Sequence, residues 1–155
     1  MEQDGATQQR LGSALVALQL ALMLALAWLA LPIFLQGQAG AGPWALAGAG
    51  SALGGWALAA NRPGNFNIRP TPRAGGRLVQ AGPYRWIRHP MYTAVLSCAL
   101  AAAWAGAGGW GWWAAAALAV VLALKSVFEE RWMAQAHPGY GAYRLRTRRF
   151  LPWLV

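Results

Sequence analysis

The sequence predicts an all-α fold, an integral membrane bundle of about four transmembrane helices with a cytosolic loop and a C-terminal amphipathic segment. Two observations support this fold class. Hydrophobic residues make up 57% of the chain and charged residues only 11%, whereas soluble domains carry about 25% charged residues. The hydrophobic residues are also gathered into four runs separated by polar segments. With 155 residues, the chain has the length of one ordinary domain, so we assign residues 1–155 to a single domain.

The first hydrophobic run covers residues 11–35 and is interrupted only by Gln19 and Pro32. At about 1.5 Å per residue, it is long enough to cross a hydrocarbon core of about 30 Å. A secretory signal peptide would have a basic segment followed by a shorter apolar stretch. Glu2 and Asp4 precede this run instead, so we expect a retained transmembrane helix.

The three further runs cover residues 44–60, 91–106 and 112–128; all are rich in small residues, and the first of them is rich in both Ala and Gly. Lipid gives helices no hydrophobic reason to associate, so membrane helices pair where small residues let their backbones approach closely. We therefore expect these runs to form a tight bundle.

Basic residues are confined to segments that would lie on one side of a four-helix membrane protein. Of the 13 Lys and Arg residues, one precedes the first run, six lie in residues 61–90, and six lie at or after the end of the fourth run. The uncharged connection at 36–43 and the Gly/Trp turn predicted at 107–111 have none. Because positively charged loops stay in the cytoplasm, four spans place both termini and the segments 61–90 and 129–155 there.

Tryptophans mark the opposite side of the predicted bundle. Trp44, Trp110, Trp112 and Trp113 stand next to the two neutral connections, where an outer aromatic belt is expected. The Ala-, Gly-, Trp- and Arg-rich composition is typical of a GC-rich bacterial genome. The expected location is therefore a bacterial cytoplasmic membrane.

The net charge of +9 raises the question of a nucleic-acid partner. We expect none, because the hydrophobic runs leave no soluble scaffold to present a basic face to a duplex. The bilayer, with its anionic head groups, is the expected partner, and the sequence indicates no obligate protein partner. We also expect no metal, because two histidines and two paired carboxylates do not form a recognisable ligand set.

Three features of the sequence are better explained by packing than by chemistry. The glycines of Gly48-Ala-Gly50-Ser-Ala-Leu-Gly54 resemble a dinucleotide fingerprint, but that motif needs a preceding strand and a following acidic residue. We interpret them as a small-residue helix contact. We expect Cys98, within an apolar run, to be an inert packing residue, and His137, followed by Pro and Gly, to lie in a turn.

The segment GPYRWIRHPMY, residues 82–92, is the first candidate functional motif. His89 can cap the following helix and Pro90 suits its first turn. The amino end of that helix then carries partial positive charge beside Arg85 and Arg88, which favours carboxylate or phosphate ligands. The alternative is a positively charged anchor that binds lipid phosphates.

Glu129 and Glu130 are the second candidate motif, as the only acidic residues after Asp4. They end the fourth run, where a carboxylate is costly unless it has a partner. One of them can pair with Arg88 or Arg131. The other could accept hydrogen bonds from ribose hydroxyls or attract a sulfonium cation, and the sequence leaves open which residue does which.

The tail contains Tyr140 and Tyr143, followed by four arginines at 144, 146, 148 and 149 and by Phe-Leu-Pro. The two tyrosines would share a face if this segment is helical. The alternative interpretation is an amphipathic anchor on the membrane surface.

Taken in order, GPYRWIRHPMY, a hydrophobic hairpin, Glu129-Glu130-Arg131 and the aromatic, basic tail resemble the isoprenylcysteine carboxyl methyltransferase family and the related phospholipid methyltransferases. Residues 61–72, with Asn-Arg-Pro, Phe66, Pro70 and Pro72, also resemble bacterial members. The resemblance covers about residues 61–152. The first two runs match only as generic membrane helices.

The resemblance implies an S-adenosylmethionine-dependent methyltransferase whose lipophilic acceptor enters from the bilayer. It implies that the cofactor is bound by Tyr84, Arg88, His89, Pro90 and Tyr92, with Glu129 or Glu130. It further implies catalytic roles for Glu130, His89 and Arg149, and acceptor contacts from Tyr140, Tyr143 and Arg148, with Arg148 or Arg149 near the acceptor or closing the pocket.

The acceptor and the reaction leave alternatives open. A carboxylate acceptor is already ionised and needs no general base, whereas an amine would have to lose a proton, for which Glu130 or His89 are candidates. Prenylated cysteines are not expected in bacteria, which argues for another lipophilic acceptor. The competing functions are an NADPH-dependent membrane reductase and a non-enzymatic small membrane bundle. The sequence does not indicate an oligomeric state.

Overall fold

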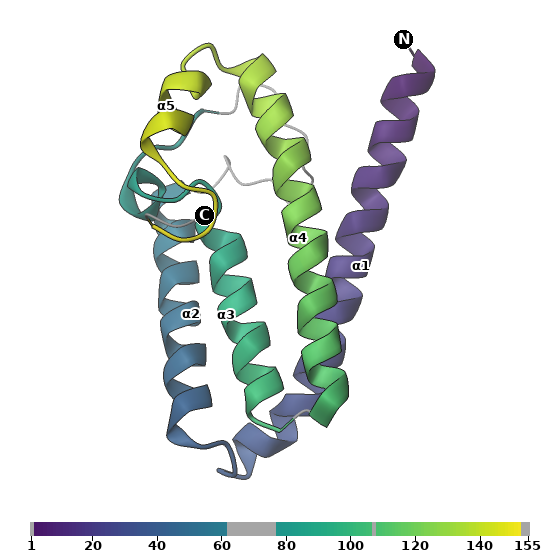
Figure 1. Ribbon diagram of the computed structural model, residues 1–155, viewed down its shortest axis with the longest axis vertical. Coiled ribbons are helices and arrows are strands. Elements are labelled where there is room, and N and C mark those ends of the chain that lie inside the picture. Colours follow the sequence, from purple (N-terminus) through teal and green to yellow (C-terminus); the bar gives the residue numbers. More distant parts are fainter. Residues whose placement is uncertain (1, 62–76, 107, 153–155) are drawn as a thin grey trace.

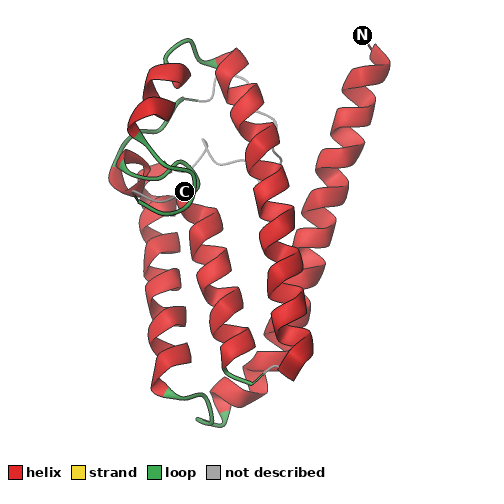
Figure 2. Ribbon diagram, viewed as in Figure 1, coloured by secondary structure: helices red, strands yellow, loops and turns green. Residues whose placement is uncertain are grey.

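The computed structural model describes residues 2–61, 77–106 and 108–152, with side chains from residue 10 onward. Within this part of the chain the fold is all-helical apart from one isolated β-bridge (Figures 1 and 2). The elements are α1 (Glu2–Leu35), α2 (Ala41–Asn61), the 3-10 helix η1 (Gly82–Arg85), α3 (Pro90–Trp104), α4 (Gly108–Ala136) and α5 (Tyr140–Arg146). The stretch with Phe66, Pro70 and Pro72 lies outside the described residues, as do Arg62, Arg69 and Arg73.

The four predicted hydrophobic helices are present, but α1, α2 and α4 are longer than predicted, α1 and α4 by the most. Helix α1 begins at Glu2 instead of residue 11, and it continues through Pro32 to Leu35. Helix α4 continues to Ala136 instead of ending at 128, because residues 129–136 are mostly good helix formers. Hydrophobicity marked the apolar part of each helix, and helix propensity carries both beyond it.

The turn predicted at 107–111 is wrong in its extent. Helix α3 ends at Trp104 and α4 already begins at Gly108, so Trp110 and Gly111 are helical. Gly106 has φ 119° and Gly108 has φ 66°. Both values lie in the region that favours glycine. These two glycines therefore allow the change of direction from α3 to α4, and α4 can begin before Trp110.

Helices α2 and α3 pack at very short range, as the small residues predicted. A Cβ atom built on Gly50 would lie 2.9 Å from the Cβ of Ser97 and 3.0 Å from the carbonyl oxygen of Ala94. Gly54 faces Ala94 as well. Gly50 and Gly54 therefore serve the packing of α2 against α3. Cys98 lies in the same interface, with its Sγ near the carbonyl oxygen of Ala47.

A second contact joins α1, α3 and α4. It buries Leu26 and Ala30 of α1 against alanines 99, 102 and 103 of α3 and Ala115, Leu118 and Leu122 of α4. Toward its N-terminus α1 leans away from the other helices (Figure 1). Only 17% of its most apolar stretch is buried inside the protein, so most of this helix presents apolar side chains outward.

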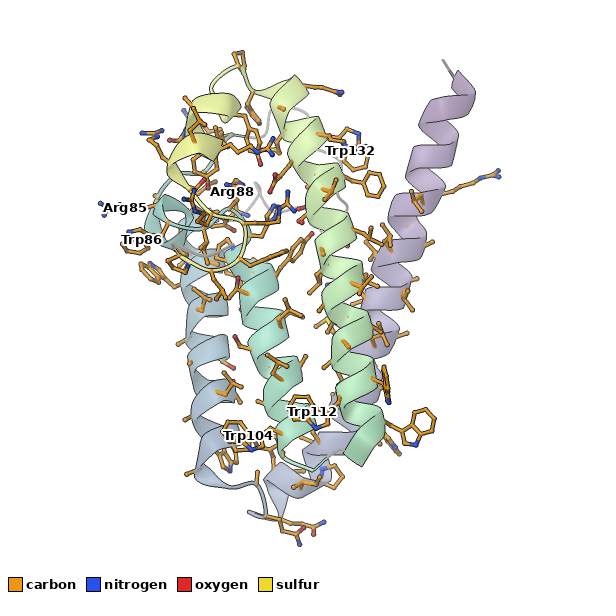
Figure 3. The ribbon with its side chains drawn as sticks, in the orientation of Figure 1. Arg85, Trp86, Arg88, Trp104, Trp112 and Trp132 are labelled. Atoms are coloured by element: carbon orange, nitrogen blue, oxygen red, sulfur yellow. The ribbon has the colours of Figure 1, made fainter. Side chains whose placement is uncertain are left out.

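The two ends of the bundle differ in charge. The polar end holds the N-terminus, η1, α5 and the last turns of α4, while the neutral end holds the connections at 36–40 and 105–106 (Figure 1). Both neutral connections lack charged residues. Trp104 and Trp112 lie near the neutral end, and Arg85, Trp86, Arg88 and Trp132 lie toward the polar end (Figure 3). The arrangement of the helices therefore places the charged segments at one end of the bundle and the uncharged connections at the other.

Two of the described helices are long and apolar enough to cross a membrane: α1, over Arg10–Leu35, and α4, over Gly108–Ala136. Helix α3 is apolar but has 15 residues, or about 22 Å at 1.5 Å per residue. This is shorter than the hydrocarbon core of about 30 Å. The helices α2 and α3 are therefore not identified as spans by their length and composition.

Replacing Gly50 by alanine should destabilise the protein, because the new methyl group would push α2 and α3 apart. Overpacking of this kind costs about 1–3 kcal/mol. Gly48 is the matched control, since nothing lies within 4 Å of a Cβ built there. We expect G48A to melt at or above the wild-type temperature in detergent and G50A well below it. Equal melting temperatures would contradict the close α2–α3 contact.

Candidate active site

Backbone pairing brings the tail of the chain onto the segment before α3. Ile87 and Arg148 form a parallel β-bridge. The amide of Arg88 donates to the carbonyl oxygen of Arg148 at 2.8 Å, and the amide of His89 donates to that of Arg149 at 3.0 Å. These bonds hold the two basic segments in register at the polar end of the bundle.

The carboxylate of Glu130 lies at the centre of this region with 5% of its side chain exposed. Its Oε1 accepts from Arg88 Nε at 3.1 Å and from Arg149 Nε at 2.9 Å, and its Oε2 accepts from Arg149 Nη2 at 3.2 Å. Arg144 approaches Oε2 at 3.8 Å. These contacts favour the ionised form of the carboxylate and occupy most of its acceptor positions.

His89 bridges the two glutamates. Its Nε2 lies 3.2 Å from Oε1 of Glu130 and its Nδ1 lies 3.5 Å from Oε2 of Glu129. Burial alone would lower the pKa of His89, but the hydrogen bonds and negative charges of Glu129 and Glu130 outweigh it and raise the pKa. The ring therefore favours the protonated form, in which both nitrogens are donors.

His89 occupies the N-cap position of α3 and Pro90 is the first residue of the helix, as predicted, but the His89 side chain makes no capping hydrogen bond. The ring binds the carboxylates instead. His89 also stacks on Tyr92 with ring centroids 5.3 Å apart and an interplanar angle of 5°. The first turn of α3 thus aligns an imidazole and a phenol toward α4.

Glu129 is more accessible than Glu130, with 20% of its side chain exposed. It accepts a hydrogen bond from the hydroxyl of Tyr92. Burial, followed by the charge of Glu129, raises the pKa of Tyr84 to about 12, so that hydroxyl stays protonated near the same carboxylate. Two tyrosines and one histidine therefore surround a carboxylate that retains some contact with the outside.

The tail residues predicted to contact an acceptor have structural contacts in this conformation. Tyr140 and Tyr143 are on one face of α5, as predicted, and each is 3% exposed. The Tyr143 hydroxyl donates to the carbonyl oxygen of Tyr84 at 2.9 Å, which fastens α5 to η1. Arg148 is exposed and joins the bridge through its backbone. Their role toward an acceptor stays a prediction.

The structure brings together most of the residues that the sequence singled out. Around the glutamate pair it gathers one set from the 82–92 motif and the tail: Tyr84, Arg88, His89, Tyr92 and Arg149. Pro90 is buried and forms the helix start. Arg131, a suggested partner of the glutamates, instead has its guanidinium over the ring of Phe128. His137 lies in the turn between α4 and α5, as predicted.

Two residues near the site were not singled out from the sequence, Thr147 and Lys125. Thr147 was not considered, yet its carbonyl and hydroxyl oxygens both accept from Arg88 Nη1. Lys125 was counted with the basic residues at the end of the fourth run, but it is 1% exposed and lies inside the bundle. Its Nζ donates to Oε1 of Gln19 in α1 at 2.6 Å. A polar residue interrupting each of two apolar runs was the available signal.

The described residues hold no group of three or more His, Cys, Asp and Glu side chains that could bind a metal ion. What they hold is a helical bundle with two candidate membrane spans and a cluster of carboxylates, arginines, tyrosines and a histidine at its polar end. Such an arrangement can bind a cation at Glu129 and an anion at the arginines.

The sequence matches the family described as phospholipid methyltransferase over residues 51–139, more than half of the chain. The protein therefore belongs to the phospholipid methyltransferase family, a family of methyltransferases associated with membranes. The match includes the 82–92 motif and the glutamate pair and ends before α5. No curated protein and no solved structure matches the chain significantly.

Replacing Glu130 by glutamine should strongly destabilise the protein, because it leaves Arg88, Arg149 and His89 without their shared carboxylate. Removing one partner from a buried ion pair costs about 3–5 kcal/mol. R131Q is the control, since it removes a charge from an exposed position on the same helix. Unfolding in detergent by heat or denaturant measures the effect. An E130Q variant as stable as R131Q would contradict the central role of Glu130.

The stability of the protein should fall as pH rises above about 6.5, the ordinary pKa of His89. The folded state raises this pKa, so the contribution of His89 is fully present below the unfolded value and is lost as pH rises through the folded value. We expect H89Q to lose this part of the pH dependence and H137Q to keep it. Melting temperatures across pH 6–9 test this, and identical profiles for wild type and H89Q would contradict it.

Proposed function

We propose that the protein is an S-adenosylmethionine-dependent methyltransferase that methylates a lipophilic acceptor at the membrane surface, similar to the isoprenylcysteine carboxyl methyltransferases. Family membership supports the methyl-transfer reaction. One observation carries the assignment of the site. Two adjacent carboxylates lie at the polar end. Glu130 is surrounded by Arg88, Arg149 and His89, whereas Glu129 contacts Tyr92 and His89 and keeps 20% of its side chain exposed.

The residues present fit a sulfonium cofactor. S-adenosylmethionine would supply an electrophilic methyl group on a positively charged sulfur. The Glu129 carboxylate, 20% exposed, would attract that charge, and the rings of Tyr84 and Tyr92 beside it would add favourable contacts for a cation. Arg88 is fixed by Glu130 and Thr147, so its proposed role is to hold the segment before α3 in place beside the site. Tyr84, His89 and Tyr92 would then act on the cofactor through Glu129 and not by direct contact.

The electrostatics of the cluster favour an acceptor that is already ionised. Glu130 is paired with two guanidinium groups and a histidine, which makes it a poor proton acceptor. His89 favours its protonated form and is poor for the same purpose. We therefore propose that the acceptor is a carboxylate, which needs no general base, in preference to an amine. Positioning and exclusion of water would provide most of the rate.

Arginines are suited to bind such an acceptor. Arg149 and Arg144 have 28% and 60% of their side chains exposed next to the buried Glu130. An anionic head group drawn from the bilayer would meet positive charge at the polar end before it reached the methyl group. This arrangement supports an orienting role for Arg149, with Arg148 at the rim.

We further propose that helices α1, α2, α3 and α4 all cross the bilayer, with the polar end in the cytoplasm. The distribution of basic residues supports this orientation. Helix α4 has 29 residues, about 43 Å at 1.5 Å per residue, so it exceeds a core of about 30 Å. If its first turn is at the neutral-end interface, Glu129 and Glu130 reach the opposite interface. Helix α3 is shorter than the hydrocarbon core, so the segment before it, residues 82–89, would cover the remaining distance to the interface.

Two other functions make different predictions. An NADPH-dependent membrane reductase would bind NADPH, and a non-enzymatic bundle would bind neither nucleotide tightly. No observation favours either function over methyl transfer.

Calorimetric titration of the protein in detergent tests the proposal. We expect micromolar binding of S-adenosylmethionine and S-adenosylhomocysteine and no binding of NADPH. E129Q should bind S-adenosylmethionine at least about tenfold more weakly, since a charge-assisted contact contributes roughly 1.5–3 kcal/mol. Its melting temperature should stay close to that of the wild type.

The control for this experiment is H137A, which changes a turn residue away from the glutamates. Its affinity should equal that of the wild type. Binding of NADPH alone would support the reductase, and binding of no nucleotide by folded protein would support the non-enzymatic bundle. Normal affinity in E129Q would remove Glu129 from the cofactor site.

A further inference from the structure

Lys125 is the only lysine in the chain, and it lies inside the bundle with 1% of its surface exposed. It is part of α4, about one turn from the glutamate pair toward the neutral end. Its Nζ donates to Oε1 of Gln19 at 2.6 Å and lies 5.2 Å from the centroid of the Tyr92 ring. A charged group at this depth of a membrane helix is costly and is usually retained for a function.

The surroundings of Lys125 connect it to the candidate site. Residues 125 and 129 are four apart on α4 and share a face. Tyr92 connects them, because its ring faces the Lys125 ammonium and its hydroxyl donates to Glu129. The amide oxygen of Gln19 and the ring face of Tyr92 both suit a cation.

A purely structural role would be to join α1 to α4 through Gln19. That role does not require a positive charge, because an apolar side chain would pack between the same helices at lower cost. The charge has a distinct consequence at Glu129. It opposes the attraction of that carboxylate for a second cation, and a charge on a side chain that is 1% exposed is screened less than a charge at the surface.

We propose that the Lys125 ammonium sets the balance between the cationic methyl donor and its neutral product at this site. This inference rests on the proposed function. A fixed positive charge disfavours a bound sulfonium and leaves a neutral thioether unaffected. It therefore raises the energy of the charged ground state relative to a transition state in which that charge is being lost. Lys125 is a specificity-determining residue that acts through the field at Glu129.

The test is the ratio of the dissociation constants of S-adenosylmethionine and S-adenosylhomocysteine, measured by calorimetry in detergent. In K125M, an apolar residue of similar length removes the charge, so the sulfonium compound should gain affinity relative to the thioether. We expect the ratio to fall at least about fivefold, because two unit charges closer than roughly 17 Å interact by at least about RT ln 5 at an effective dielectric constant of about 20. A loss of packing alone would weaken both ligands and leave the ratio unchanged.

A second variant keeps the inference testable if K125M does not fold. Q19E places a carboxylate next to Nζ of Lys125 and cancels much of its field, while the lysine itself stays in place. It should lower the ratio in the same direction. R131Q is the matched control, because it removes a positive charge from an exposed position of the same helix, where water screens it. Its ratio should equal that of the wild type.

The outcomes separate this inference from the proposed function. Wild-type protein that binds both compounds, with unchanged ratios in K125M and Q19E, would overturn the inference and leave the proposed function intact. Wild-type protein that binds neither compound would overturn both. A lowered ratio in either variant, with R131Q unchanged, supports the role of Lys125.

Discussion

The buried carboxylate of Glu130 joins three segments that are far apart in the sequence. Its ion pairs reach Arg88 and His89 before α3 and Arg149 in the tail. A carboxylate at 5% exposure would be very costly without these partners, and each arginine would be costly without the carboxylate. The position of the tail, the start of α3 and the environment of Glu129 all follow from this one charge balance.

The neighbouring Glu129 is chemically different because the arginines Arg88 and Arg149 pair with Glu130. The backbone pairing of residues 87–89 with 148–149 directs the arginines toward Glu130, and α4 turns the adjacent side chain toward Tyr92. Glu130 therefore stabilises the fold, and under the proposed function Glu129 is the carboxylate that meets the ligand.

The bundle also separates a tightly packed pair of helices from a more loosely attached one. Small residues let α2 and α3 pack so closely that a Cβ atom on Gly50 would collide with α3. Helix α1 joins the other helices through a limited hydrophobic contact and the hydrogen bond from Lys125 to Gln19. Because that bond ends beside Tyr92, the first helix is coupled to the polar end by a polar contact as well as by packing. The family match begins only at residue 51, so this coupling adds a helix outside the matched region to the site.

The sequence by itself determined the all-helical character of the fold, the four apolar helices and the grouping of basic residues at one end, because hydrophobic runs and charge counts depend on local composition. It also identified the 82–92 motif and the glutamate pair. Only the tertiary structure decided which glutamate is saturated, that Tyr143 fastens α5 to η1, and that Lys125 is buried beside Tyr92. These depend on contacts between residues that are 19 to 106 positions apart in the chain, and no local pattern records which of two adjacent side chains faces a distant arginine.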